Sequence, residues 1–100
     1  MRILFLGDVV GIAGCSKLMN NLLSEIKSKK IDFVIVNGEN AAAQGVGLTK
    51  EICNDFFNCG VDVITTGNHV WDQKEIMEFI EKEEKLLRPK NLFEPAPGKG

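Results

Sequence analysis

The sequence predicts an α/β fold built around a parallel sheet. Three short apolar runs, at 3–6, 33–36 and 61–65, are separated by stretches with helical periodicity. Uninterrupted apolar runs of this kind are typical of buried parallel strands. Their spacing of about 30 residues fits one strand, one loop and one crossover helix. We therefore expect a parallel-sheet-centred, layered α/β sandwich.

Helices are expected between these strands. The first should span 17–29, after a glycine-rich turn at 7–14, with Ser16 as its N-cap. Thr49 is a plausible N-cap for the second helix, and Gly60 is well placed as the residue that follows its C-cap. The third strand should begin directly after Gly60.

The last third of the chain predicts one more helix and one more strand. Asp72 and Glu75 have the spacing of a capping box, so we expect a helix over 73–84. A short fourth strand is expected at 86–87. Because prolines, glycines and a lack of periodicity follow, 89–100 is expected to be a terminal loop.

The composition is that of an ordinary soluble globular domain. The 100 residues are 44% hydrophobic and 26% charged, with a formal net charge of −2, so no large nucleic-acid surface is expected. No apolar stretch reaches the roughly 18 residues needed to cross a membrane. A cytoplasmic location is the default expectation. Cys15, Cys53 and Cys59 form no CxxC pair, which favours reduced thiols over a disulfide framework or a zinc knuckle.

Polar side chains follow each predicted strand at the point where it ends. Asp8 follows the first strand, Glu39 and Asn40 follow the second, and Asn68 and His69 follow the third. The carboxyl ends of parallel strands lie along one edge of a sheet, where ligands bind in open α/β folds. These five residues are therefore expected to converge on one site.

The residue types at this edge suit phosphoryl chemistry with two metal ions. Two divalent cations roughly 4 Å apart place positive charge beside phosphate oxygens and make a nucleophile from water. Glu39 has two oxygens and can bridge both ions, while Asp8, Asn40 and Asn68 can add oxygen ligands. The imidazole of His69 suits proton donation to a leaving oxygen.

Each of these residues also has a structural interpretation. Asp8, Asn40 and Asn68 are common turn residues when considered singly, and His69 could be a satisfied structural imidazole. Asp72 could orient His69, but its position before a helix favours an N-cap. Convergence of all five site residues by chance is less probable than any single structural role.

Three further features are interpreted conservatively. The glycines of 7–14 lack the GxGxxG spacing, which disfavours a dinucleotide site. Trp71 could stack on a base, although packing is favoured. Cys15 could have a lowered pKa near a helix start, although a bystander thiol is favoured.

Three segments carry a family resemblance. The sequences GDVVG at 7–11, NGENAA at 37–42 and TGNHVWD at 66–72 resemble the first three motifs of the calcineurin-like metallophosphoesterases. They are most similar to the YmdB-like branch, bacterial dinuclear metal phosphodiesterases similar to those acting on 2′,3′-cyclic nucleotides. The similarity extends to PGKG at 97–100. Val10 replaces the histidine of the more widespread first motif, as it does in this branch.

The resemblance implies a role for each candidate residue. Asp8 and Asn40 would lie at the first metal, Glu39 would bridge, Asn68 would bind the second metal, and His69 would face the leaving group. The cofactors would be two divalent ions of iron, manganese, zinc or magnesium. The substrate would be a phosphodiester or a cyclic nucleotide.

The chain is short for this family, whose members run to about two and a half times its length. Residues 1–100 would then be one partial domain, the N-terminal half of a metallophosphoesterase-like sandwich, with little or no activity alone. An alternative is a non-catalytic module that self-associates or pairs with a separate C-terminal half. A third possibility is a nucleotide-binding fold that uses the glycine loop.

Overall fold

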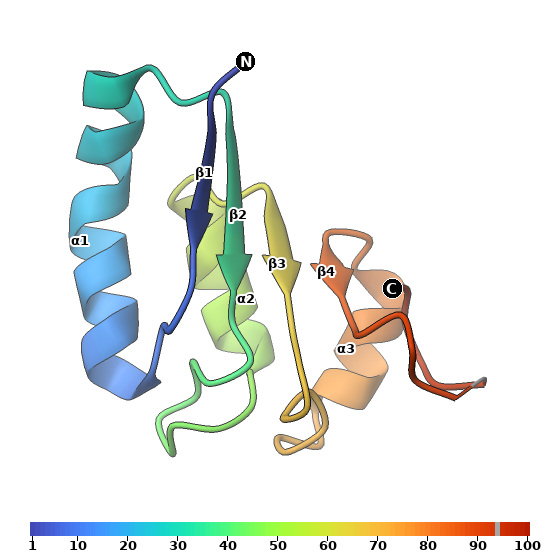
Figure 1. The fold of residues 1–100 in the computed structure, drawn as a ribbon. Coiled ribbons are helices and arrows are strands. Elements are labelled where there is room, and N and C mark those ends of the chain that lie inside the picture. Colours follow the sequence, from blue (N-terminus) through green and yellow to red (C-terminus); the bar gives the residue numbers. More distant parts are fainter. Residues whose placement is uncertain (94) are drawn as a thin grey trace.

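The computed structural model describes residues 1–93 and 95–100 and contains a four-stranded parallel sheet (Figure 1). The strands neighbour one another in chain order: β1 (Ile3–Leu6), β2 (Phe33–Asn37), β3 (Val63–Thr65) and β4 (Leu86–Leu87). Each pair is parallel, so all four carboxyl ends lie at the same edge. The predicted α/β class and the short fourth strand are confirmed.

The core lies between one face of the sheet and the helices α1 (Gly11–Lys29), α2 (Lys50–Asn58) and α3 (Ile76–Lys82). Alternate residues of each strand point into this core and form a row across the sheet. Leu6 is in register with Val36, Val36 with Ile64, and Ile64 with Leu86. The last three are fully buried. Each helix adds a buried apolar stripe, represented by Leu22, Phe56 and Ile80.

The opposite face of the sheet is apolar but open among the described residues. Phe5, Ile35 and Val63 form a second register row across β1, β2 and β3. The side chain of Phe5 is 59% exposed and that of Ile3 is 56% exposed, while Ile35 and Val63 are half-buried. The apolar runs predicted strands buried on both faces. In the structure, helices cover only one face of the sheet among the described residues.

Helix α1 begins at Gly11, six residues before the predicted start, so the prediction of a turn throughout 7–14 is wrong. Gly11 has φ +62°, and its N–H donates to the carbonyl of Asn40 at 2.9 Å. A glycine accepts this left-handed conformation without a Cβ penalty, so the chain turns directly into the helix. Ser16 lies inside the helix, and the N-cap position belongs to Val10.

The boundaries of α2 match their sequence signals, whereas β3 begins two residues later than predicted, at Val63. Thr49 Oγ1 accepts a hydrogen bond from the Ile52 N–H at 3.3 Å, which confirms the cap. Gly60 has φ +112° and directly follows the C-cap residue Cys59. A positive φ here favours glycine.

The predicted capping box of the third helix is wrong. Helix α3 begins at Ile76, and its N-cap residue Glu75 makes no side-chain cap hydrogen bond. The Glu75 carboxylate instead accepts from the Lys50 N–H at 3.0 Å, at the start of α2. Asp72 lies outside the helix in the turn after β3 and is bonded to His69. A tertiary partner for Glu75 and a local partner for Asp72 therefore take the place of the expected cap.

The described residues of the terminal segment form turns and bends, as expected for 89–100, with one bridge that pairs Lys99 with Leu87. Glu94, which falls in the predicted loop, lies outside the described residues. The segment folds over the buried Arg88, whose Nε donates to the Pro97 carbonyl at 3.1 Å.

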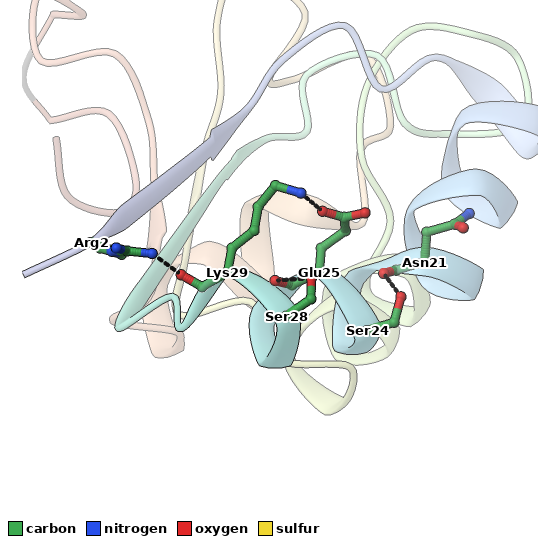
Figure 2. Close-up of polar contacts among 6 residues, drawn as sticks. All are labelled: Arg2, Asn21, Ser24, Glu25, Ser28 and Lys29. Atoms are coloured by element: carbon green, nitrogen blue, oxygen red, sulfur yellow. Dashed lines mark hydrogen bonds and ion pairs between the residues drawn. The ribbon is translucent and has the colours of Figure 1, made fainter.

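Hydrogen bonds connect the residues at the amino-terminal edge of the sheet. Figure 2 shows Arg2 Nη1 donating to the carbonyl of Lys29 at the end of α1, at 2.7 Å. The Arg2 N–H donates to Asp32 Oδ2 at 2.7 Å, and the Val34 N–H donates to Asp62 Oδ2 at 2.8 Å. Both carboxylates at this edge therefore accept from the backbone. In the part of the chain that the structure describes, no helix is long and apolar enough to cross a membrane.

Candidate metal site

The topology brings the predicted site residues to one edge of the sheet. Asp8 follows β1, Glu39 and Asn40 follow β2, and Asn68 and His69 follow β3. Because β2 lies between β1 and β3, its loop is flanked by the other two (Figure 1). All five residues lie beyond the carboxyl ends of the strands, as their parallel spacing predicts.

Asp8 stands at a sharp turn between β1 and α1. Its backbone φ is +53°, a left-handed conformation that is uncommon outside glycine, although aspartate adopts it more readily than most residues. The residue is exposed. A non-glycine residue held in this region carries local strain, which is found disproportionately at functional sites.

Glu39 reaches from the loop after β2 to the turn after β3. A Cβ added at Gly67 would lie 2.6 Å from Glu39 Cδ, closer than real Cβ contacts allow. Glycine at this position therefore leaves the space that the carboxylate occupies. The contact joins the second and third predicted motifs directly and places a carboxylate in the middle of the candidate site.

Two adjacent residues each have a buried side-chain oxygen without a hydrogen-bond partner in the described part of the chain. Glu39 Oε2 and Asn40 Oδ1 have no hydrogen-bond partner among the described residues. Leaving a buried polar atom unpaired costs about 1–3 kcal/mol, and more when the group is charged. One carboxylate oxygen and one amide oxygen are ligands that hard divalent cations accept. The pair therefore fits a metal ion.

Three of the backbone groups of Glu39 and Asn40 are already hydrogen-bonded within the fold. The carbonyl of Asn40 accepts from the Gly11 N–H at 2.9 Å, and the carbonyl of Glu39 accepts from the Gly47 N–H. The Glu39 N–H donates to Asn37 Oδ1 at 3.3 Å. These bonds fix the loop, so Glu39 and Asn40 present their side chains from a held backbone.

His69 is hydrogen-bonded through its ring to a carboxylate. His69 Nδ1 lies 2.8 Å from Asp72 Oδ2, and both side chains are more than one-third exposed. The other ring nitrogen, Nε2, lies 3.4 Å from Asn68 Nδ2. The imidazole is therefore next to a candidate metal ligand. Asp72 was expected either to cap a helix or to orient His69, and the structure shows it bonded to His69.

The described residues contain no group of three or more His, Cys, Asp or Glu side chains that could hold a metal ion. The candidate site differs from such a cluster because two of its four oxygen donors are the asparagine amides of Asn40 and Asn68. Amide oxygens suit hard cations but carry no charge. The donor set fits a cation and is incomplete as a dinuclear centre.

The cysteines and the tryptophan stay outside this chemistry. All three thiols are free, and burial raises the pKa of Cys15, Cys53 and Cys59 above the ordinary thiol value. A lowered pKa for Cys15 is therefore wrong, and its thiol donates to the Ala41 carbonyl at 3.2 Å. Trp71 packs against the core, as favoured.

The fold and the polar groups at its carboxyl edge define an α/β protein with a candidate ligand site beyond the ends of parallel strands. The chain belongs to the YmdB-like protein family, whose model matches residues 4–100. The resemblance read from the three sequence motifs is therefore confirmed.

Proteins of known sequence and structure are similar over nearly the whole chain. It is 50% identical to the 2′,3′-cyclic-nucleotide 2′-phosphodiesterase of Bacillus subtilis, covering 100% of the chain and 38% of that protein. It is 42% identical to a putative phosphatase/phosphodiesterase of Mycoplasma pneumoniae, covering 92% of the chain and 32% of that protein. The chain thus spans about a third of the length of these curated relatives.

Two crystal structures share the fold. A hypothetical protein from Thermus thermophilus superposes with a TM-score of 0.89 at 39% identity, covering 100% of this chain and 38% of that one. A novel phosphatase from Mycoplasma pneumoniae gives a TM-score of 0.89 at 36% identity, covering 98% of this chain and 36% of that one.

Proposed function

We propose that this chain is the N-terminal part of a dinuclear metal-dependent phosphodiesterase. The observation that carries the proposal is the pair of buried, unpartnered oxygens, Glu39 Oε2 and Asn40 Oδ1, at the carboxyl edge. Relatives named as phosphodiesterases or phosphatases support the hydrolase class. Their names also support a phosphodiester substrate, of which a 2′,3′-cyclic nucleotide is the first candidate.

In this proposal four side chains hold the metal ions. Glu39 would contribute to both ions, Asp8 and Asn40 would be further ligands of the first, and Asn68 would be a ligand of the second. Iron, manganese, zinc and magnesium all accept such oxygen-rich ligands. When bound, the ions supply positive charge at the phosphate oxygens and lower the pKa of water.

The reaction is the addition of water to phosphorus with loss of one ester oxygen. A new P–O bond forms to the water oxygen, which releases one proton to solvent, and the P–O bond to the departing alcohol breaks. His69 gives the proton on Nε2 to that departing oxygen, so the alcohol leaves neutral. The ring stands beside a candidate metal ligand, because Asn68 Nδ2 is 3.4 Å from His69 Nε2, and this proximity supports a role at the same site.

The chain alone offers too few ligands for full activity. A dinuclear site draws on about six or more protein groups, whereas the proposal finds four oxygen ligands and one imidazole here. We expect little or no hydrolysis of a chromogenic phosphodiester in the presence of manganese. Robust turnover by the purified 100-residue chain would refute this corollary and would show that the site is complete.

Calorimetric titration with Mn²⁺ tests the metal site without requiring turnover. The wild-type chain is expected to bind Mn²⁺, and Glu39→Gln to bind it at least about tenfold more weakly, because a charged ligand is lost. Glu78→Gln removes the same charge at an exposed position of α3 and serves as the matched control. Equal affinity in all three proteins would contradict the proposal.

The association alternative rests on the open face of the sheet. Ile3 and Phe5 are more than half exposed, which exposes apolar surface that a second copy or a complementing half could cover. Sedimentation of the purified chain separates the cases. A concentration-dependent increase in mass favours association, whereas a monomer at high concentration counts against it. Association through this face is compatible with a metal site at the edge.

A further inference from the structure

We propose that Asp72 is a positioning residue that fixes the ring of His69, with Nδ1 bonded to its carboxylate and Nε2 left to face the candidate site. The inference deepens the proposed function and rests on it for its catalytic meaning. The orientation itself can be measured in the chain without metal or substrate.

The turn after β3 places the two side chains together. The Val70 N–H donates to the Gly67 carbonyl at 3.1 Å, and the Asp72 N–H donates to the His69 carbonyl at 3.1 Å. Val70 is 1% exposed, so the turn is anchored in the core at its middle. The backbone therefore brings the carboxylate of Asp72 to the ring of His69 three residues earlier.

The loop after β2 holds this turn from the other side. Gly47 has φ +83°, and a Cβ there would lie 3.2 Å from Asp72 Cβ and 2.8 Å from Gln73 Cγ. Gln73 Nε2 donates to the Val46 carbonyl at 3.1 Å. The Cβ of Asp72 thus lies against the neighbouring loop, which holds the backbone from which its exposed carboxylate projects.

The bond selects which ring nitrogen is available. A neutral imidazole carries one N–H, and a carboxylate at Nδ1 favours the proton there because it can only accept. Nε2 is then the nitrogen on the side of Asn68. In the proposed reaction Nε2 gives up a proton while Nδ1 keeps its own at Asp72, so the ring that acts as the acid carries a proton on each nitrogen. A ring free to rotate would present the wrong nitrogen in part of the molecules. An aspartate that fixes tautomer and orientation is known to matter greatly in acyl-transfer enzymes.

The structure assigns Asp72 no competing structural task. Helix α3 begins at Ile76, four residues later, so Asp72 does not cap it. Its carboxylate is exposed and meets the ring of His69 at 2.8 Å. A side chain held there by two loops and directed at the imidazole beside a candidate ligand is explained by the orientation of that imidazole.

Long-range proton–nitrogen NMR on the metal-free chain measures this orientation directly. His69 is the only histidine, so the two imidazole nitrogen signals need no further assignment. At a pH where the ring is neutral, the wild-type chain should be predominantly the Nδ1–H tautomer. Asp72→Ala should lower the ratio of Nδ1–H to Nε2–H tautomers by roughly tenfold or more, as expected for the loss of one charge-assisted hydrogen bond.

Two further variants separate positioning from general effects. Asp72→Glu keeps a carboxylate and should recover part of the Nδ1–H preference, whereas Glu78→Ala removes an exposed carboxylate from α3 and should leave the tautomer ratio unchanged. A predominantly Nε2–H ring in the wild-type chain, or the same ratio in wild type and Asp72→Ala, would overturn the proposal. A merely structural Asp72 would change the melting temperature and not the tautomer.

The outcome is independent of the metal proposal. If the chain fails to bind Mn²⁺ but shows the predicted tautomers, the positioning of His69 stands and the metal assignment falls. If Mn²⁺ binds and Asp72→Ala leaves the tautomer unchanged, the positioning proposal falls and the metal assignment stands.

Discussion

The two edges of the sheet treat their acidic side chains in opposite ways. At the amino-terminal edge, Asp32 accepts from the Arg2 N–H at 2.7 Å and Asp62 from the Val34 N–H at 2.8 Å. At the carboxyl edge, Glu39 keeps a buried oxygen with no partner in the described part of the chain, although its backbone is fully engaged. Asp32 and Asp62 at the first edge are hydrogen-bonded within the fold, whereas Glu39 at the second edge has an oxygen that could accept a ligand.

Only the carboxyl edge loses stability through this difference. A buried acceptor without a donor lowers the free energy of unfolding by about 1–3 kcal/mol, whereas a carboxylate that accepts from a backbone N–H raises it. Real proteins break such local rules mainly at functional sites. Substitutions at the carboxyl edge should therefore change ligand binding, and substitutions at the amino edge should change stability.

The largest effect is expected from Gly67→Ala at the carboxyl edge. The new Cβ would overlap the carboxylate of Glu39, which must move away from the centre of the site. We expect Mn²⁺ affinity to fall by about 100-fold, since a displaced ligand is equivalent to a lost one. Calorimetric titration gives the affinity, and circular dichroism reports whether the fold is kept.

Gly7→Ala is the matched control for this substitution. Gly7 also follows a strand at the same edge, but a Cβ there would meet only Phe5 Cε1 at 3.7 Å, an ordinary contact. Mn²⁺ affinity should remain close to that of the wild-type chain. A loss of similar size in both variants would mean that the Glu39–Gly67 contact does not position the carboxylate.

An intermediate effect, on stability alone, is expected from Asp62→Ala at the amino edge. The N–H of Val34, a residue that is 2% exposed, would lose its acceptor. The free energy of unfolding should fall by about 1–3 kcal/mol, the cost of leaving a buried donor unpaired. Chemical denaturation measures this change. The control Glu78→Ala, on the exposed side of α3, should lie within about 0.5 kcal/mol of wild type.

Mn²⁺ binding by Asp62→Ala provides the sharper comparison, because the proposal requires it to be retained while the chain is folded. Loss of metal binding without unfolding would show that the two edges are coupled. The division between a structural edge and a binding edge would then be incorrect.

The smallest effect is expected from Arg2→Ala. Its guanidinium donates to the Lys29 carbonyl at the end of α1, in an exposed environment (Figure 2). Exposed contacts of this kind contribute little, so the free energy of unfolding should change by less than about 0.5 kcal/mol. Thermal unfolding at matched ionic strength measures it. A change of more than about 2 kcal/mol, well outside the usual range for a surface substitution, would show that this contact contributes to global stability.

The sequence predicted the fold well where a single periodicity decided the outcome. The apolar runs at 3–6 and 33–36 and the cap at Thr49 were predicted because strands and helix ends have local signals. The start of α1 differs from the prediction because glycine is typical of turns, whereas the positive φ of Gly11 allows the helix to begin there. An apolar run does not show which face is covered, and the face that carries Phe5 is open among the described residues.

The location of the site at one edge was predictable, but its internal contacts were not. Parallel strands with similar spacing bring Asp8, Glu39 and Asn68 to the same edge whatever the loops do. The contact of Glu39 with Gly67 depends on how two loops pack, which no local pattern encodes. The role of Asp72 differs from the favoured prediction because its spacing fits a cap as well as a contact with His69, three residues earlier, and the structure shows the contact.

The most direct test of the comparison is the thermal midpoint of wild type and Glu39→Gln, each with and without Mn²⁺. Ligand that binds only the folded chain raises the midpoint, so the wild-type protein should be stabilised by the metal. Glu39→Gln should show a clearly smaller metal-dependent rise at the same Mn²⁺ concentration, with a metal-free midpoint equal to or above that of wild type, because an unpartnered carboxylate has been neutralised. A metal-free midpoint well below wild type, together with an undiminished response to Mn²⁺, would contradict the assignment of Glu39 to a ligand site.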